Sequence, residues 1–177
     1  MGSFLSVSKV QMEEITAGLQ DSGVRFLLVA REGSWKLKHG YGGEGLVVPW
    51  CDQLRVLCHP SIGGFWSHCG WNSVKEGIFA GTPFLTFPLC ADQNLNSKLI
   101  VEDWKIGWRI KKHQFTRGEI SSLVKKLMDL ESDDEVKQMR ARAKELQKEC
   151  LQAIERHGSS ESNINSFIHS ILQFNDH

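Results

Sequence analysis

The sequence has no excess of charge of either sign. Its 177 residues include 21 Lys and Arg and 21 Asp and Glu, which gives a formal net charge of zero. Proteins that bind nucleic acid or anionic lipid through their overall charge need a positive field, which this balance does not provide. The sequence also lacks any run of about 18 apolar residues, the length that a membrane-spanning helix needs. We therefore expect a globular domain that has neither nucleic acid nor membrane as a partner.

Paired cysteines and a secretory leader are lacking as well. The cysteines are odd in number and none are spaced C-x-x-C: Cys51, Cys58, Cys69, Cys90 and Cys150. This pattern disfavours a disulfide framework and fits a reducing compartment. The first ten residues contain neither the basic region nor the long apolar run of a secretory signal. We therefore expect a cytoplasmic location.

A zinc site is the main alternative use of the cysteines and histidines. Two adjacent pairs, Cys58-His59 and His68-Cys69, flank a predicted strand, and Cys90 follows later in the chain. Structural zinc sites favour ligands separated by a few residues. Neighbouring residues on a strand point to opposite faces, so both members of such a pair rarely reach one ion. We therefore predict no metal site.

Short apolar segments alternate with helical segments over the first 110 residues. The segments with the length and composition of buried strands are 24–30, 46–48, 62–67, 84–87 and 106–110. A capping pair, Ser8 with Gln11, begins the first helix, and helices are expected over 53–58 and 73–80, the second ended by Gly81. This alternation predicts an α/β fold, with a mostly parallel sheet covered by helices on both faces.

The rest of the chain, 116–172, is predicted to be a helical tail. Thr116 with Glu119 and Ser132 with Glu135 are capping pairs for two helices. A final helix has a wide apolar stripe, formed by Ile164, Phe167, Ile168, Ile171 and Leu172. We expect this stripe to dock on its own domain. The alternative, a stripe that faces a missing partner domain, stays open.

Residues suited to binding a diphosphate follow the third predicted strand. The segment F-W-S-H-C-G-W-N-S contains a strand through Ser67 and a helix that starts near Asn72 or Ser73. The N–H groups and dipole of a helix start favour anions. Asn72, Ser73 and His68 add side-chain donors, and Gly70 lets a ligand approach the backbone. Alternatively, Asn72 and Ser73 are ordinary N-caps.

Three further features have the chemistry of a sugar-nucleotide site, each with a simpler alternative. Glu76 can accept hydrogen bonds from two ribose hydroxyls, or can complete a capping box with Ser73. Trp50, after a strand and a proline, can stack on a base, or can be a core residue. The adjacent pair Asp92-Gln93 offers acceptors and donors to sugar hydroxyls, or is an ordinary loop dipeptide.

From Trp50 to Gln93 the sequence resembles the signature box of the plant secondary-product UDP-glycosyltransferases. The flanks, G-S-F-L-S near the start and S-K-L-I-V-E-D-W-K-I-G-W after the box, are similar too, so the resemblance covers about the first 115 residues. That family has the GT-B fold, in which two Rossmann-like domains face a cleft. The resemblance implies that residues 1–177 are a single C-terminal, donor-binding domain, and that the N-terminal acceptor domain is absent.

The resemblance also implies a role for each matching residue. Trp50 would stack on uracil, while the Cys51 backbone and Gln53 would help hold base and ribose. Glu76 would bind the ribose hydroxyls. The diphosphate would be held by Ser3, His68, Asn72 and Ser73. The sugar would be contacted by Trp71, Asp92 and Gln93. The closing Gln favours UDP-glucose as the donor substrate, and no cofactor is implied.

Two departures from the family pattern matter. Asp52 stands where the family usually has proline. The catalytic base of the family is a His of the acceptor domain, partnered by an Asp, and no residue here matches it. An inverting transfer needs such a base to take the proton of the acceptor hydroxyl. We therefore expect the donor-binding domain of a glucosyltransferase that acts on a small-molecule hydroxyl, or alternatively a non-catalytic nucleotide-sugar-binding or interaction module.

Overall fold

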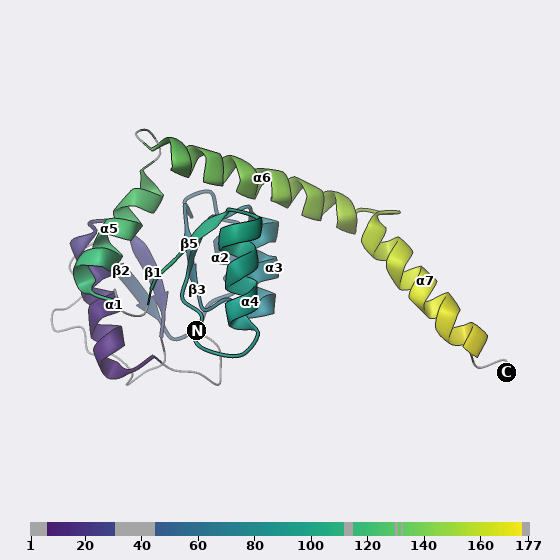
Figure 1. Ribbon diagram of the computed structural model, residues 1–177, viewed down its shortest axis with the longest axis horizontal. Helices are drawn as coiled ribbons and strands as arrows, with labels where there is room; N and C mark the ends of the chain where they lie inside the picture. The colour runs from purple at the N-terminus through teal and green to yellow at the C-terminus, as the bar shows by residue number, and fades with distance from the viewer. Residues whose placement is uncertain (1–6, 31–44, 112–114, 130, 132, 175–177) are drawn as a thin grey trace.

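The computed structural model describes residues 7–30, 45–111, 115–129, 131 and 133–174. Figure 1 shows an α/β body with one long helix running across it and a last helix that projects away. The elements are α1 (Lys9–Asp21), β1 (Phe26–Val29), β2 (Gly45–Val48), α2 (Gln53–Leu57), β3 (Phe65–Ser67), α3 (Trp71–Ala80), β4 (Phe84–Thr86), α4 (Gln93–Lys98), η1 (Leu99–Asp103), β5 (Gly107–Arg109), α5 (Arg117–Met128), α6 (Asp134–Ile154) and α7 (Ser159–Phe174). Each predicted strand is present; β2 is one residue longer than predicted, and the other strands are shorter.

The strand pairings among the described residues are parallel, as predicted. They form two groups, β1 with β2, and β3-β4-β5 with β4 in the centre. Phe84 of β4 is opposite Phe65 of β3 and Gly107 of β5. All three residues of β4 are buried, as expected for a strand that is covered on both faces.

Alternation along β4 separates two apolar clusters, one on each face of the sheet. Leu85 belongs to a cluster with buried residues of α1 and α5, including Ile15 and Ile120. Phe84 belongs to the other cluster, with Val74 of α3 and residues of η1 and α6. Successive strand residues point to opposite faces, so this division places helices on both sides, as predicted.

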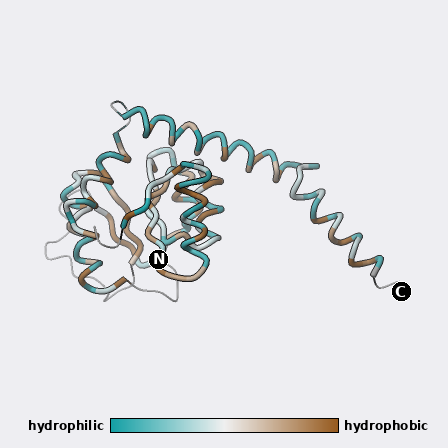
Figure 2. Tube along the Cα trace, in the orientation of Figure 1, coloured by the Kyte–Doolittle hydropathy of each residue, from teal (hydrophilic) through white to brown (hydrophobic). Residues whose placement is uncertain are grey.

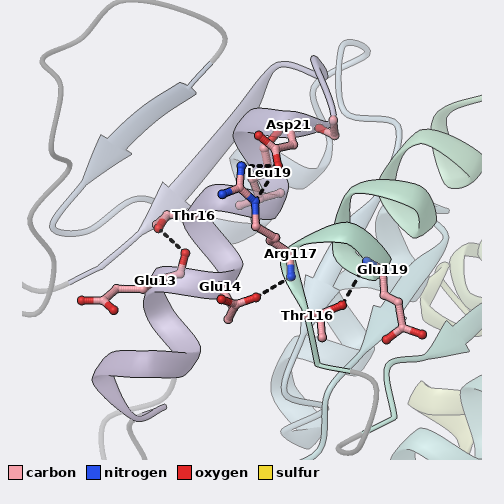
Figure 3. A network of polar contacts seen from close by, with 9 residues as sticks. Glu13, Glu14, Thr16, Leu19, Asp21, Thr116, Arg117 and Glu119 are labelled. Atoms are coloured by element: carbon pink, nitrogen blue, oxygen red, sulfur yellow. Dashed lines mark hydrogen bonds and ion pairs between the residues drawn. The ribbon is translucent and has the colours of Figure 1, made fainter.

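Helices α1 and α5 lie close together and are joined by polar contacts (Figure 3). A Cβ added to Gly18 would lie 2.6 Å from the Cβ of Ile120, so glycine permits this approach. The Arg117 guanidinium donates to Asp21, with its Nη2 2.6 Å from Oδ2. The Arg117 backbone N–H donates to Glu14 at 2.5 Å. These contacts fix α5 against the helix that lies beside the β1–β2 pair.

Two expectations about the tail are wrong. The predicted capping pair of Ser132 and Glu135 is replaced by Asp133, whose Oδ1 accepts from the N–H groups of Glu135 and Val136, at 2.9 and 3.3 Å. A carboxylate that accepts two N–H groups makes a stronger cap than a hydroxyl. Ser132 itself lies outside the described residues.

The Thr116 cap of α5 is confirmed, because its Oγ1 accepts from the Glu119 N–H.

The second error concerns α7, which does not dock on its own domain. Figures 1 and 2 show it leaving the body with apolar residues along its length. The stripe residues are between 46% and 66% exposed: Ile164, Phe167, Ile168, Ile171 and Leu172. After α6, Glu155 is extended and His157 has a φ of 64°, so the backbone itself turns α7 away.

Among the described helices, none is long and apolar enough to cross a membrane.

Candidate functional site

The turn between β3 and α3 presents a helix start without a side-chain cap. Gly70 is the N-cap residue and α3 begins at Trp71, so Asn72 and Ser73 lie within the first turn. The alternatives in which these residues are N-caps, or in which Ser73 forms a capping box with Glu76, are therefore wrong. The first N–H groups of a helix have no acceptor within it. With glycine as the cap, these groups face outward as donors for an anion.

Backbone conformation shapes the same turn. Cys69 has a φ of 66°, which costs about 1–3 kcal/mol for a residue other than glycine. Its backbone N–H donates to Ser67 Oγ at 3.0 Å, and its buried thiol fixes it in the core. A Cβ added to Gly70 would lie 2.8 Å from Nε2 of His68. Glycine at this position therefore keeps the approach to the helix start open.

A second group of polar side chains is joined by hydrogen bonds between α2 and α3. The Gln53 amide Nε2 donates to Ser73 Oγ at 3.0 Å and to Glu76 Oε2 at 2.5 Å. Asp52 is the N-cap of α2, with its Oδ1 accepting from the Arg55 N–H at 3.1 Å. Asp52 therefore forms a defined turn where the family usually has proline. The turn presents Gln53 to the first turns of α3.

These side chains line a cleft of about 640 Å³. The predicted residues in its lining are Trp50, Cys51, Gln53, His68, Ser73 and Glu76. Trp50 is 76% exposed, so its interpretation as a core residue is wrong. The wall also includes apolar residues of α1 and β1, Ile15 and Leu28 among them, which the sequence analysis missed. The cleft thus combines an exposed indole, a fixed carboxylate and a helix start.

The segment after β4 is joined to the β3–α3 turn by a hydrogen bond from Asn96 to the Cys69 carbonyl. Gln93 is only 7% exposed, and its amide oxygen accepts from the N–H groups of Leu89 and Cys90 at 2.9 and 3.2 Å. Asp92 is exposed, and its carboxylate accepts from Asn96 Nδ2 at 2.9 Å. Gln93 thus stabilises the loop before α4, and the contact of this pair with a sugar stays a prediction.

Five predicted residues lie outside the cleft lining: Gly70, Trp71, Asn72, Asp92 and Gln93. Trp71 is 45% exposed at the first position of α3, and Asn72 beside it is exposed. Ser3 lies outside the described residues. The cleft therefore contains the predicted nucleoside residues, and the predicted sugar residues lie around its β3–α3 end.

One residue of the site was missed in the sequence. Asn96 donates from Nδ2 to the backbone oxygen of Cys69 at 3.0 Å as well as to Asp92. Its position four residues after Asp92 is the spacing at which helical side chains meet. The contact with Asp92 could therefore have been predicted from this spacing. The contact with Cys69 could not, because it joins residues 27 apart in the chain.

Burial sets the protonation of two side chains at the turn. It lowers the pKa of His68, and the Asp92 charge opposes this shift. His68 is therefore a neutral imidazole near pH 7, able to donate one hydrogen bond. Burial raises the pKa of the Cys69 thiol to about 11. Cys69 is therefore not a thiolate nucleophile.

In the described part of the chain, no three His, Cys, Asp or Glu side chains are grouped to hold a metal ion.

Comparison with known sequences gives a match over most of the chain. The profile of the family described as "UDP-glucoronosyl and UDP-glucosyl transferase" matches residues 1–146. The chain is 55% identical over 180 aligned residues to UDP-glycosyltransferase 87A2 of Arabidopsis thaliana, which covers 98% of this chain and 39% of that protein.

Comparison with solved structures agrees. UGT2 of Phytolacca americana, solved with UDP-2fluoro-glucose and pterostilbene, matches with a TM-score of 0.86 and 34% identity, over 96% of this chain and 39% of that one. Os79 from O. sativa, solved with UDP, matches with a TM-score of 0.84 and 33% identity, over the same shares. The chain thus spans about 39% of the length of these relatives. The Rossmann-like architecture of a GT-B glycosyltransferase, expected from the sequence, is confirmed.

Proposed function

This chain belongs to the UDP-glucoronosyl and UDP-glucosyl transferase family, and we propose that residues 1–177 form the UDP-sugar-binding domain of a plant-type glycosyltransferase. The observation that supports this most strongly is the hydrogen-bonded group of Gln53, Ser73 and Glu76 in the cleft. It lies beside an uncapped helix start and an exposed indole. Relatives solved with UDP and with UDP-2fluoro-glucose support the same class of ligand.

The nucleoside is assigned to the α2 side of the cleft. The exposed ring of Trp50 offers a flat apolar surface to uracil, and the adjacent Cys51 offers backbone groups. Glu76 accepts hydrogen bonds from the ribose hydroxyls, while Gln53 keeps its carboxylate oriented. A carboxylate that is oriented before binding loses less conformational freedom when the ligand arrives.

The diphosphate is assigned to the start of α3. Asn72 and Ser73, with the N–H groups of the first turn, supply donors where the helix dipole is positive. Neutral His68 adds a further donor, and protonation on binding strengthens it, because a nearby diphosphate favours the imidazolium. Gly70 leaves space for the phosphate oxygens to reach the backbone. Ser3 is assigned to the same anion.

The sugar is assigned to Trp71, Asp92 and Gln93, and UDP-glucose is the proposed donor. Asp92 offers an acceptor pair to two hydroxyls, and the Gln93 amide nitrogen offers a donor. In the full-length protein, an acceptor hydroxyl attacks the anomeric carbon, the bond from that carbon to the UDP oxygen breaks, and the configuration inverts. The base that takes the hydroxyl proton, and the small-molecule acceptor, belong to the part of the protein beyond this chain.

The state of the cysteines bears on the location of the protein. The five cysteines, all within the described residues, are free thiols. We propose the cytoplasm as the compartment, because a reducing environment keeps such thiols unpaired. The proposed transfer needs the donor sugar nucleotide, an acceptor hydroxyl and a base, and we propose no cofactor.

Titration of the purified chain with UDP and with UDP-glucose, followed by tryptophan fluorescence, tests the proposal. We expect saturable quenching that is lost or strongly weakened in Trp50→Leu and Glu76→Ala. Glu145→Ala is the matched control, since Glu145 is exposed on α6, away from the cleft. A chain that unfolds cooperatively yet shows no saturable response to either ligand would contradict the proposal.

A further inference from the structure

Asn96 connects the two segments to which diphosphate and sugar are assigned. It lies in α4 and is 6% exposed. Its Nδ2 donates one hydrogen to the backbone oxygen of Cys69 at 3.0 Å, and the other to Asp92 Oδ2 at 2.9 Å. Both protons of the amide nitrogen are therefore used, one on each segment. A side chain of this kind holds its two partners at a fixed separation.

Each partner of Asn96 is adjacent to a helix start. Cys69 immediately precedes Gly70, the N-cap of α3, and Asp92 is the N-cap residue of α4. The left-handed φ of Cys69 is an unfavourable conformation for a side chain, so the surrounding contacts must maintain it. The bond from Asn96 holds its carbonyl, and the bond to Ser67 holds its N–H. Asn96 thus fixes the orientation of the turn that precedes α3.

The helix that contains Asn96 is itself fixed to the sheet. Ser97, fully buried, is hydrogen-bonded through Oγ to Thr86 Oγ1 of β4 at 2.8 Å and accepts from Arg109 Nε of β5 at 2.8 Å. Arg109 also donates from Nη2 to the Asn94 carbonyl at 3.1 Å. These bonds prevent α4 from sliding along the sheet. Because α4 is fixed to the sheet, Asn96 holds both Asp92 and the Cys69 turn in fixed positions.

We propose that Asn96 is a positioning residue that couples the sugar-contacting carboxylate of Asp92 to the diphosphate-binding turn at Cys69. It touches neither ligand group itself. This inference rests on the proposed function, because it assumes that Asp92 and the α3 turn hold two parts of one donor. Its consequence is specific: the extra affinity that the glucose of UDP-glucose adds over UDP depends on Asn96.

The test compares the dissociation constants of UDP and UDP-glucose, measured by calorimetry, in the wild type and in Asn96→Ala. Losing a hydrogen bond to a carboxylate costs on the order of tenfold in affinity. In Asn96→Ala we expect the affinity for UDP-glucose, relative to the affinity for UDP, to fall by about this factor. Asn94→Ala is the matched control, because its side chain is exposed on the same helix; it should leave the ratio unchanged.

A second variant separates coupling from packing. Asn96→Asp keeps the side-chain shape, but directs a carboxylate at Asp92 and at the Cys69 carbonyl, so it should shift the ratio in the same direction and by more. A ratio equal to the wild type in both folded variants would overturn the inference, even if both affinities fell together. If the wild type binds neither ligand, the proposed function fails, and the inference fails with it.

Discussion

The amide nitrogen of Gln53 lies 2.5 Å from Oε2 of Glu76, on the neighbouring helix. The same nitrogen lies 3.0 Å from the hydroxyl of Ser73. Gln53 therefore orients the carboxylate that we propose binds the ribose. Its orientation depends on how α2 packs against α3.

Gln53→Ala removes this orientation while leaving Glu76 in place. We expect UDP affinity to fall by about tenfold, because one hydrogen bond to a carboxylate is lost and Glu76 gains freedom. Calorimetric titration with UDP measures the effect. Gln138→Ala, at an exposed position of α6, is the control and should bind as the wild type does. Unchanged affinity in folded Gln53→Ala would remove Gln53 from the site.

Gly77→Ala and Gly118→Ala should have opposite effects on stability. A Cβ at Gly77 would overlap the ring of Phe84, whereas nothing lies within 4 Å of a Cβ at Gly118. Overpacking at Gly77 should lower the free energy of unfolding by about 1–3 kcal/mol. Gly118→Ala, within α5, should raise it by up to about 1 kcal/mol, because alanine favours the helix. Urea unfolding measures both, and equal shifts in the two variants would refute the packing argument.

The contact between α1 and α5 should depend on its apolar part more than on its ion pair. Ile120 is fully buried, so Ile120→Ala should destabilise by about 2–5 kcal/mol. The Arg117–Asp21 pair is largely exposed, with side chains 58% and 42% accessible, so Arg117→Ala should cost under about 1 kcal/mol. Thermal unfolding ranks the two. A larger loss from Arg117→Ala would mean that the polar contacts of Figure 3 dominate this interface.

His68 should make stability depend on pH. Burial lowers its pKa in the folded chain, so below the usual value of about 6.5 the unfolded chain binds more protons. Stability is therefore complete above that value and falls as the pH drops through the window down to the folded pKa. His68→Gln should lose part of this dependence.

The measurement is the urea midpoint at pH 7.5 and pH 5.5. His169→Gln is the control, since His169 is exposed on α7. Saturating UDP should reduce the fall between the two pH values, because a diphosphate beside His68 favours the protonated imidazole. If the pH dependence of stability is identical in His68→Gln and the wild type, His68 is not its source.

The elements of the fold were predictable where their signals are local. Gly81 ends α3 with a φ of 64°, as its place after the helix indicated, and Ser8 with Gln11 forms the capping box that its spacing predicted. Both features depend on residues three or four apart. The same local logic failed for α7, because an apolar stripe shows that a helix has a face to cover without showing what covers it.

By itself, the sequence determined the α/β alternation and provided side chains of the types suited to a sugar nucleotide. The tertiary structure decided which of them meet. Gln53 reaches Glu76 across 23 residues, and Asn96 reaches Cys69 across 27. Such contacts follow from how helices pack on a shared sheet, which no local spacing encodes. For that reason the residue types of the site were evident in the sequence, while its hydrogen bonds, including those of Asn96, are seen only in the folded chain.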